Sequence, residues 1–183
     1  MPPAIVDQPW PPEAGEDLRR PDGRPVVCPT TGRVLRAYHD QLVVWATLTP
    51  GKQPPPASPS LFPVLLDTGF NETFVMQRRQ AEAWLTPAVF ATFPGHPFQL
   101  KIGPELIPAW NVSLWVYPNV PGARDPDSSG SPVRIRAVPA IWLTPSGSAY
   151  TKEKPLLGLR ALRFNGLSLR IDGAAGRFSL DAP

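Results

Sequence analysis

Short apolar runs separated by Pro- and Gly-rich turns fill the sequence from residue 41 to its end. Residues 41–49, 61–66 and 73–76 are rich in β-branched and aromatic side chains, which favour strands. Similar patterns predict further strands at 98–102, 111–117, 133–138, 141–144, 167–172 and 177–180. In the strand beginning at residue 133, apolar residues alternate with arginines, so one face is expected in the core and the other in water.

Two segments predict short helices. Residues 78–85 consist mostly of good helix formers, and Pro87 ends this pattern. Residues 159–165 predict a second helix, with Gly166 placed as its C-terminal cap. Many short strands with only these two helices predict an all-β fold, either a barrel or a closed sheet.

Proline changes this picture at the N terminus. The chain has 27 prolines among its 183 residues, and they are dense in residues 1–33 and again in 54–59. Because proline lacks the backbone donor and fixes φ, residues 1–33 are predicted to form a Pro-rich arm, extended or disordered. An arm that wraps a partner subunit is the alternative. The ordered domain is then expected at 34–183, with residues 118–132 as a loop rich in Gly, Pro, Asp and Ser.

Charge and residue counts argue against several classes of function. The net charge is +3 and no long run of Lys and Arg occurs, so no nucleic-acid partner is expected. No apolar run approaches the roughly 20 residues of a membrane helix, and the first residues do not resemble a signal peptide. We therefore expect no membrane association and a cytoplasmic location. His39 and His96 lie far apart without ligand spacing, and Cys28 is the single cysteine, so neither a metal, a cofactor nor an intramolecular disulfide is expected.

One polar motif follows an apolar strand directly. Asp67, Thr68 and Gly69 come immediately after Leu65 and Leu66. An ionisable residue at the end of an apolar strand costs free energy unless it is paired or hydrogen-bonded, and a glycine allows the backbone to turn sharply. On these residues alone, an ordinary strand-to-turn junction and a catalytic carboxylate both remain open.

The surroundings of this motif resemble a known family. Residues 64–73 resemble the catalytic loop of the retropepsin-like aspartic proteases (clan AA), and the Asp-Thr-Gly-Phe version is similar to small bacterial and archaeal members. A second segment, Leu156-Leu157-Gly158 followed by the predicted helix, resembles the family's apolar-apolar-Gly element. The two elements are further apart than in viral members, which implies an insertion, and residues 118–132 are the candidate.

The resemblance implies a fold and a reaction. The fold would be a retropepsin-like closed β-barrel, a single lobe that forms a homodimer. The family cleaves peptide bonds with two carboxylates that share one proton, and this chain carries the motif once, so Asp67 would be supplied by each of two copies. Thr68 would hydrogen-bond across the dimer axis, and Gly69 would let the backbone approach the substrate. Three residues would pack under the catalytic loop as its structural support: Leu156, Leu157 and Gly158.

Substrate-binding residues are also implied by the resemblance. A hairpin at residues 98–110 would cover a peptide or protein substrate, with its tip near Gly103, Pro104 and Glu105. Phe70 replaces the small residue of viral members and would narrow a substrate pocket. Asn71 stands where viral members often have an acidic residue, so anchoring of the peptide backbone would differ.

Two alternatives remain open at this point. A catalytically inactive relative would keep the dimeric fold as a binding or scaffold domain. An unrelated all-β interaction domain would use Asp67 merely as a turn residue. The sequence does not identify the peptide that would be cleaved.

Overall fold

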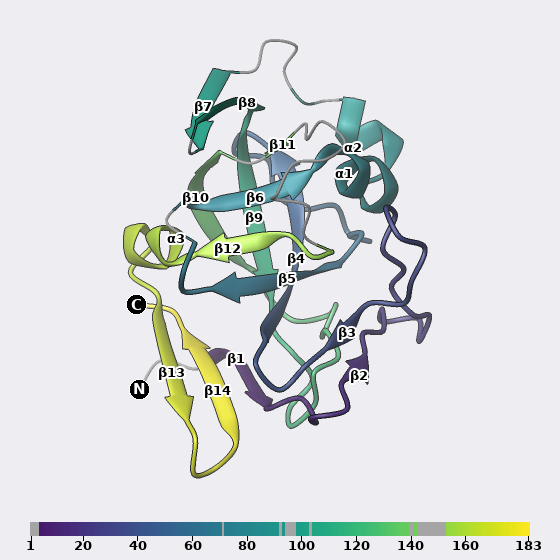
Figure 1. Cartoon of the computed structure of the whole chain (residues 1–183), viewed down its shortest axis with the longest axis vertical. Helices are drawn as coiled ribbons and strands as arrows, with labels where there is room; N and C mark the ends of the chain where they lie inside the picture. The colour runs from purple at the N-terminus through teal and green to yellow at the C-terminus, as the bar shows by residue number, and fades with distance from the viewer. Residues whose placement is uncertain are drawn as a thin grey trace.

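A curled sheet forms the centre of the molecule (Figure 1). In the computed structural model of the chain, the described residues are 4–70, 72–91, 93, 98–102, 104–139, 141–142 and 153–183. The central sheet has seven strands in the spatial order β10 (Val133–Pro139), β9 (Asn111–Tyr117), β4 (Leu42–Pro50), β5 (Phe62–Asp67), β12 (Leu156–Gly158), β6 (Phe74–Gln77) and β11 (Ile141–Trp142). Neighbouring strands run antiparallel, except that β12 is parallel to β5 and β11 is parallel to β6. The predicted all-β character is confirmed, and the sheet is a half-barrel with β10 and β11 as its edges.

Smaller elements surround this sheet. A three-stranded antiparallel sheet has the order β1 (Ala4–Pro9), β14 (Arg177–Asp181) and β13 (Ser168–Asp172). Two-stranded pairs are formed by β2 (Glu16–Asp17) with β3 (Arg36–Ala37) and by β7 (Phe98–Ile102) with β8 (Glu105–Ala109). The helices are α1 (Arg78–Trp84), α2 (Pro87–Ala91) and α3 (Leu159–Phe164). Within the described ranges, none of the helices has the length and apolar character needed to cross a membrane.

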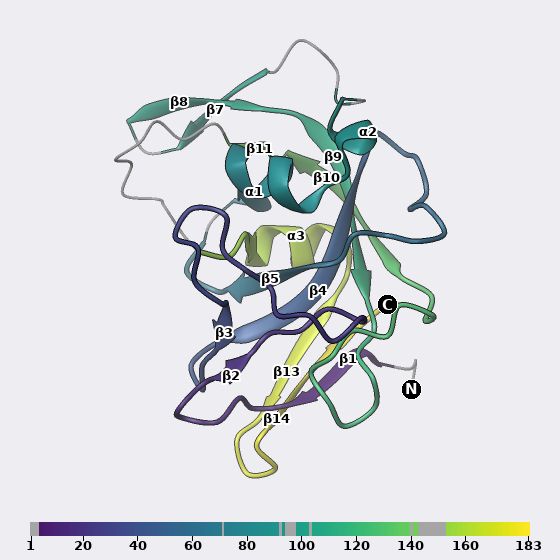
Figure 2. The same cartoon turned by 90° about the vertical axis from the view of Figure 1, so that its right-hand side faces the viewer.

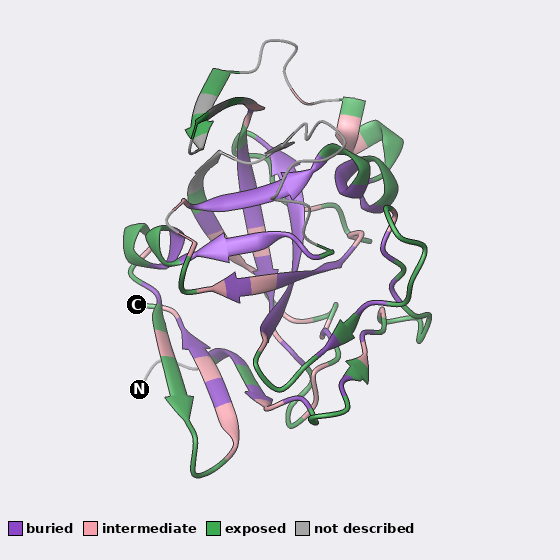
Figure 3. Ribbon diagram, in the orientation of Figure 1, coloured by how far each residue is buried: buried purple, intermediate pink, exposed green. Residues whose placement is uncertain are grey.

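The core gathers around β4, whose nine residues are all buried (Figure 3). A strand buried on both faces reads as a continuous apolar run, which is the pattern of residues 42–48. Phe62 of the neighbouring β5 stacks on Trp84 of α1, with ring centroids 5.9 Å apart and an interplanar angle of 14°. This contact fixes α1 against the sheet directly after β6.

Residues 4–33 are part of this core. Among the described residues, ordered structure begins at β1, whereas the sequence predicted that the ordered domain begins near Val34. Prolines prevent long helices but are compatible with extended chain, and several apolar residues of this segment are buried. The buried apolar residues of the segment are Ile5, Val6, Leu18, Val26 and Cys28, the last as a free thiol.

Most locally patterned elements lie where the sequence predicts them. The predicted strands from residue 41 onward correspond to β4, β5, β6, β7, β9, β10, β11, β13 and β14, and the predicted helices correspond to α1 and α3. Residues 143–144 of one predicted strand fall outside the described residues. As predicted, α1 ends before Pro87. Pro87 is also the first residue of α2, which the sequence did not predict. Its missing N–H is not needed in the first turn of a helix.

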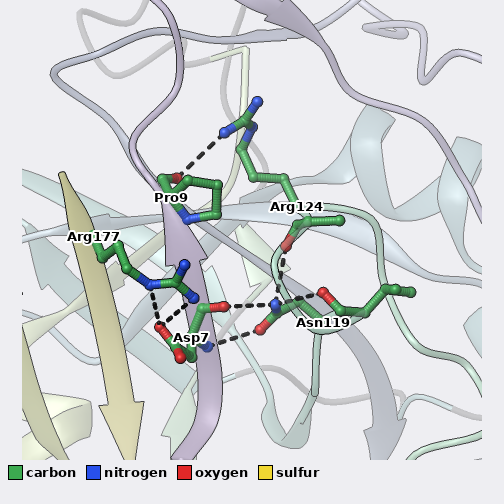
Figure 4. A network of polar contacts seen from close by, with 7 residues as sticks. Asp7, Pro9, Asn119, Arg124 and Arg177 are labelled. Carbon is green, nitrogen blue, oxygen red and sulfur yellow. Dashed lines mark hydrogen bonds and ion pairs between the residues drawn. The ribbon is translucent and has the colours of Figure 1, made fainter. Parts of the chain in front are cut away.

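Asn119 connects the N-terminal strand to the loop at 118–132 (Figure 4). Its Oδ1 accepts a hydrogen bond from the Asp7 N–H at 2.8 Å, and its Nδ2 donates to the Asp7 carbonyl at 2.8 Å. The same Nδ2 lies 2.9 Å from the carbonyl oxygens of Val120 and Ala123. The buried amide therefore pairs with β1 as a neighbouring strand would, and it holds the loop closed.

Arg124 and Arg177 complete this network around β1 (Figure 4). The Arg124 guanidinium donates to the carbonyls of Pro9 at 3.3 Å and Trp10 at 3.1 Å. Burial lowers the pKa of Arg124, and the Asp125 charge opposes that shift. Arg177 of β14 forms an ion pair of 3.0 Å with Asp7. Side chains from distant parts of the sequence thus attach the N-terminal strand at several points.

Removal of the Asn119 amide tests this attachment. Asn119→Ala would leave the Asp7 N–H and carbonyl without their partner, and we expect the free energy of unfolding to fall by about 2 kcal/mol. Chemical denaturation measures the loss. Ser128→Ala, an exposed position of the same loop, is the matched control and should change stability by less than about 0.5 kcal/mol. Equal effects of the two substitutions would contradict the role of Asn119.

A buried lysine predicts a pH dependence of stability. Lys154 is only 6% exposed, its Nζ donates to Gln41 Oε1 at 2.9 Å, and burial lowers its pKa, opposed by the charges of Glu153 and Asp40. Between this lowered pKa and the model-peptide value of 10.5, the unfolded chain binds more protons than the folded one, so this residue makes stability rise with pH.

Comparison with Lys154→Met isolates this contribution. The free energy of unfolding of the wild type, minus that of the variant, should rise as the pH increases from 7 to 10 and level off above 10.5. Lys101→Met, which removes an exposed lysine of β7, gives the baseline for general pH effects. Curves for wild type and Lys154→Met that stay parallel over this range would show that the buried charge has no such effect.

Candidate active site

Asp67 ends β5 at the point where the chain leaves the core. The preceding residues of the strand are almost entirely buried, Asp67 is half-buried, and Thr68 and Gly69 are exposed. The apolar run therefore determines where the carboxylate emerges. A loop then returns the chain to β6, which begins at Phe74. Asn71, one of the predicted substrate contacts, lies outside the described residues.

Backbone groups of the loop hold the carboxylate. The Gly69 N–H donates to Asp67 Oδ1 at 2.9 Å, and the Phe70 N–H donates to the Asp67 carbonyl at 3.2 Å. A Cβ on Gly69 would lie 3.3 Å from Oδ1, closer than most side chains tolerate, so glycine leaves room for this turn. The second carboxylate oxygen has no protein partner among the described residues.

The short strand β12 lies between the two strands that flank this loop. It pairs in parallel with β5, so that Gly158 is opposite Asp67, and it pairs antiparallel with β6. The Gly158 N–H donates to the Thr73 carbonyl at 3.0 Å. The segment after residue 153 thereby supports both ends of the Asp67 loop, and Leu156 and Leu157 are buried in the sheet below it.

Gly158 occupies a position without room for a side chain. A Cβ there would lie 2.1 Å from the Glu72 carbonyl oxygen and 2.4 Å from that of Phe70. Both neighbours are backbone atoms of the Asp67 loop, so a larger residue would displace the loop. The close approach of β12 to the loop therefore requires glycine.

The Asp67 carboxylate has no oppositely charged partner among the described residues. None of the ion pairs formed by the described residues includes Asp67. The nearby Glu72 is paired instead with Arg160 of α3, at 3.2 Å. Across the part of the chain that the structure describes, no group of three or more His, Cys, Asp or Glu is arranged to hold a metal ion. The carboxylate is therefore accessible to a ligand or to a second carboxylate.

A large open hollow borders the loop on the α3 side. Its volume is about 980 Å³, and it is lined by Phe70, Glu72, Leu159, Arg160, Leu162, Arg163, Phe164, Leu167 and Leu169. Leu159 and Phe164 are 46% and 62% exposed, which is unusual for side chains of this size. An apolar surface therefore continues from Phe70 along α3.

A hairpin is present at the predicted residues, where β7 pairs with β8. The two strands pair from Phe98 opposite Ala109 to Ile102 opposite Glu105, with exposed Pro104 in the turn. The hairpin and the carboxyl end of β5 extend toward the same side of the molecule (Figure 2). Gly103 and the side chain of Glu105 lie outside what the structure describes.

The structure thus brings together residues that are distant in the sequence. Gly158 lies against the Asp67 loop, and Phe70 lines the hollow beside it. Glu72 and Arg160, which form an ion pair beside the loop, are not among the site residues predicted from the sequence. The signal was available, because both positions adjoin the two motifs and carry opposite charges.

Replacement of Gly158 tests the support of the loop. Gly158→Ala would force a methyl group into backbone carbonyls, and we expect the free energy of unfolding to fall by about 3 kcal/mol. Thermal and chemical denaturation measure the change. Gly173→Ala is the matched control, because a Cβ at Gly173 would meet nothing within 4 Å. An unchanged stability of Gly158→Ala would mean that β12 does not lie this close to the loop.

We compared the chain with protein-family models, with curated proteins and with solved structures, and none of the three comparisons found a match. Its function is therefore inferred from its own residues and geometry.

Proposed function

We propose that the chain is a retropepsin-like aspartic endopeptidase that works as a homodimer, with Asp67 of each copy as the catalytic carboxylate. The observation that carries the proposal is the position of Asp67. It ends a buried strand, its Oδ1 is held by the Gly69 N–H, and the loop that carries it closes over Gly158. An unpaired, half-buried carboxylate on such a constrained loop is suited to proton transfer.

The reaction follows from a pair of carboxylates that share one proton. The ionised Asp67 takes a proton from a water molecule while the water oxygen attacks the scissile carbonyl carbon. The protonated Asp67 of the second copy donates to the carbonyl oxygen, which gives a neutral tetrahedral diol. When the C–N bond breaks, the nitrogen receives a proton from one carboxyl group and the diol loses one to the other carboxylate. The pair returns to its starting state without a covalent intermediate.

Two copies are required because each chain carries the Asp-Thr-Gly motif once. A two-fold axis next to the loop would bring the two Asp67 side chains together and place Thr68 against its counterpart. Thr68 is exposed and free to make that contact. The apolar surface formed by Phe70, Leu159 and Phe164 borders the loop and provides area for a second copy to bury.

The hairpin β7–β8 would cover an extended peptide bound over the two carboxylates. An extended substrate presents alternate side chains to opposite sides, so Phe70 would contact some of them and the hairpin others. Pro104 and Pro108 lie in this hairpin and restrict its backbone. These two prolines are the observation that favours the second candidate, a non-proteolytic dimeric binding or scaffold domain of the same fold, because they restrict the opening of the hairpin.

Hydrolysis by purified protein decides between these two functions. The wild type should cleave members of a peptide library between acidic and neutral pH, and Asp67→Asn should lower kcat/KM by roughly a hundredfold or more. Asp125→Asn, at an exposed position outside the site, is the matched control and should retain activity. If wild type and Asp67→Asn behave alike while both remain folded, the chain is a binding domain and not a protease.

A further inference from the structure

Two hollows near the C-terminal end of α3 share a pair of lining arginines, Arg134 and Arg136. One hollow, of about 420 Å³, is lined by Val133, Arg134, Arg136, Phe164, Asn165, Leu167 and Pro183. The other, of about 580 Å³, is lined by Gly51, Lys52, Asn111, Val112, Arg134 and Arg136. Arg134 and Arg136, two positions apart on β10, both line each of the two hollows. We call this surface, formed by Lys52, Arg134 and Arg136, the basic groove.

Arg134 is fixed by neutral groups. Its Nε donates to Ser113 Oγ at 2.9 Å, and its Nη2 lies 3.5 Å from the Gly51 carbonyl oxygen. Ser113 is buried and itself donates to Gly51. The guanidinium also lies over the ring of Trp115, 5.9 Å from the ring centroid. These contacts orient Arg134 without neutralising its charge.

The aromatic ring under Arg134 is held in turn. The Trp115 indole N–H donates to Thr49 Oγ1 at 2.9 Å, and the Thr49 hydroxyl donates to the Gln53 carbonyl at 2.6 Å. Both residues belong to paired strands of the central sheet, β9 and β4. The guanidinium is therefore positioned by a rigid layer before any ligand binds, which lowers the entropy cost of binding.

The backbone of Arg136 is held by Asn165, which is the C-terminal cap of α3 and directly precedes the predicted cap residue, Gly166. The Arg136 N–H donates to Asn165 Oδ1 at 2.7 Å, and Asn165 Nδ2 lies 3.4 Å from the Arg136 carbonyl oxygen. Asn165 Nδ2 also donates to the Ala161 carbonyl at 2.8 Å. The backbone of β10 at this edge is thus occupied, and the exposed Arg136 side chain is the group left for a ligand.

No acidic residue balances these charges. Neither hollow has Asp or Glu in its lining. Among the described residues, no carboxylate lies within ion-pair distance of Lys52, Arg134 or Arg136. By contrast, seven other arginines of the described chain form ion pairs with carboxylates: Arg24, Arg36, Arg78, Arg124, Arg160, Arg170 and Arg177. The basic groove therefore has a local positive charge that the molecule itself does not neutralise.

We propose that the basic groove binds an acidic segment of the polypeptide substrate, at a distance from the bond that is cleaved. This inference rests on the proposed protease function. An oriented guanidinium group such as that of Arg134 favours carboxylates, which accept two parallel hydrogen bonds from one arginine. Three cations in two small hollows match a few Asp or Glu side chains, whereas a nucleic acid is held by a longer basic stripe. Phe164 and Leu167, which line the groove and also the hollow beside Asp67, connect the two regions.

Peptide binding to the inactive Asp67→Asn protein tests the groove without proteolysis. The probe is a fluorescein-labelled peptide of Glu and Gly residues, with a Gln and Gly peptide as its neutral counterpart, followed by fluorescence anisotropy. The acidic probe should bind, and adding Arg134→Gln and Arg136→Gln should weaken its binding about tenfold, since hydrogen bonds to charged groups are lost. Arg33→Gln with Arg79→Gln removes the same charge at two exposed positions elsewhere and should change binding less than twofold.

Three outcomes would overturn the proposal. The neutral peptide could bind as well as the acidic one, or the two double variants could weaken the acidic probe equally. A single-stranded oligonucleotide of the same charge could bind more tightly than the peptide and depend on Arg134 and Arg136, which would assign the groove to nucleic acid. Circular dichroism of each variant excludes loss of folding as the cause.

Cleavage kinetics connect the groove to the active site. For an active wild type, adding an acidic extension to a cleaved peptide should lower KM several-fold with kcat unchanged, and the Arg134→Gln and Arg136→Gln variant should lose this advantage. An extension that leaves KM unchanged would overturn the docking role. If the wild type cleaves nothing, the proposed protease function fails, while the binding experiment still decides whether the groove takes acidic peptides.

Discussion

The close contact between Gly158 and the Asp67 loop is the constraint on which the candidate site depends. Carbonyl oxygens of Phe70 and Glu72 lie where a Cβ would be, so only glycine lets β12 pass beneath the loop. This contact joins segments about ninety residues apart and fixes the register of β12 between β5 and β6. A loop supported in this way cannot easily move, and a fixed carboxylate is what proton transfer from a bound water requires.

Helix α3 links the two surfaces to which we assign roles. Gly158 is its N-terminal cap and lies under the Asp67 loop, whereas Asn165 is its C-terminal cap and holds the backbone of Arg136. Between them, Leu159 and Phe164 present apolar surface beside the loop. A helix of six residues thus has its ends fixed by the candidate active site and by the basic groove. This arrangement places the proposed binding surface for an acidic part of the substrate and the proposed site of cleavage at opposite ends of one short helix.

Local patterns predicted most strands and both capped helices, because alternation and turn residues act over a few positions. The role of residues 4–33 was not predictable in this way. Their apolar residues follow no strand or helix period, and the position of β1 depends on distant partners of Asp7 such as Asn119 and Arg177. The motif at Asp67 and the opposite charges of Glu72 and Arg160 are visible in the sequence, but the ion pair between these two residues and the hydrogen bond from Arg134 to Ser113 form only when distant segments of the chain meet. Spacing along the chain carries little information about such contacts.

The central claim is that one active site needs an Asp67 from each of two chains, and subunit mixing tests it most directly. Wild type is incubated with a ninefold excess of Asp67→Asn until subunits exchange, and peptide hydrolysis is then measured per wild-type chain. Random pairing leaves wild-type chains mostly beside inactive partners, so activity per wild-type chain should fall to about one tenth. Activity that stays constant as the inactive variant is added would contradict the shared site.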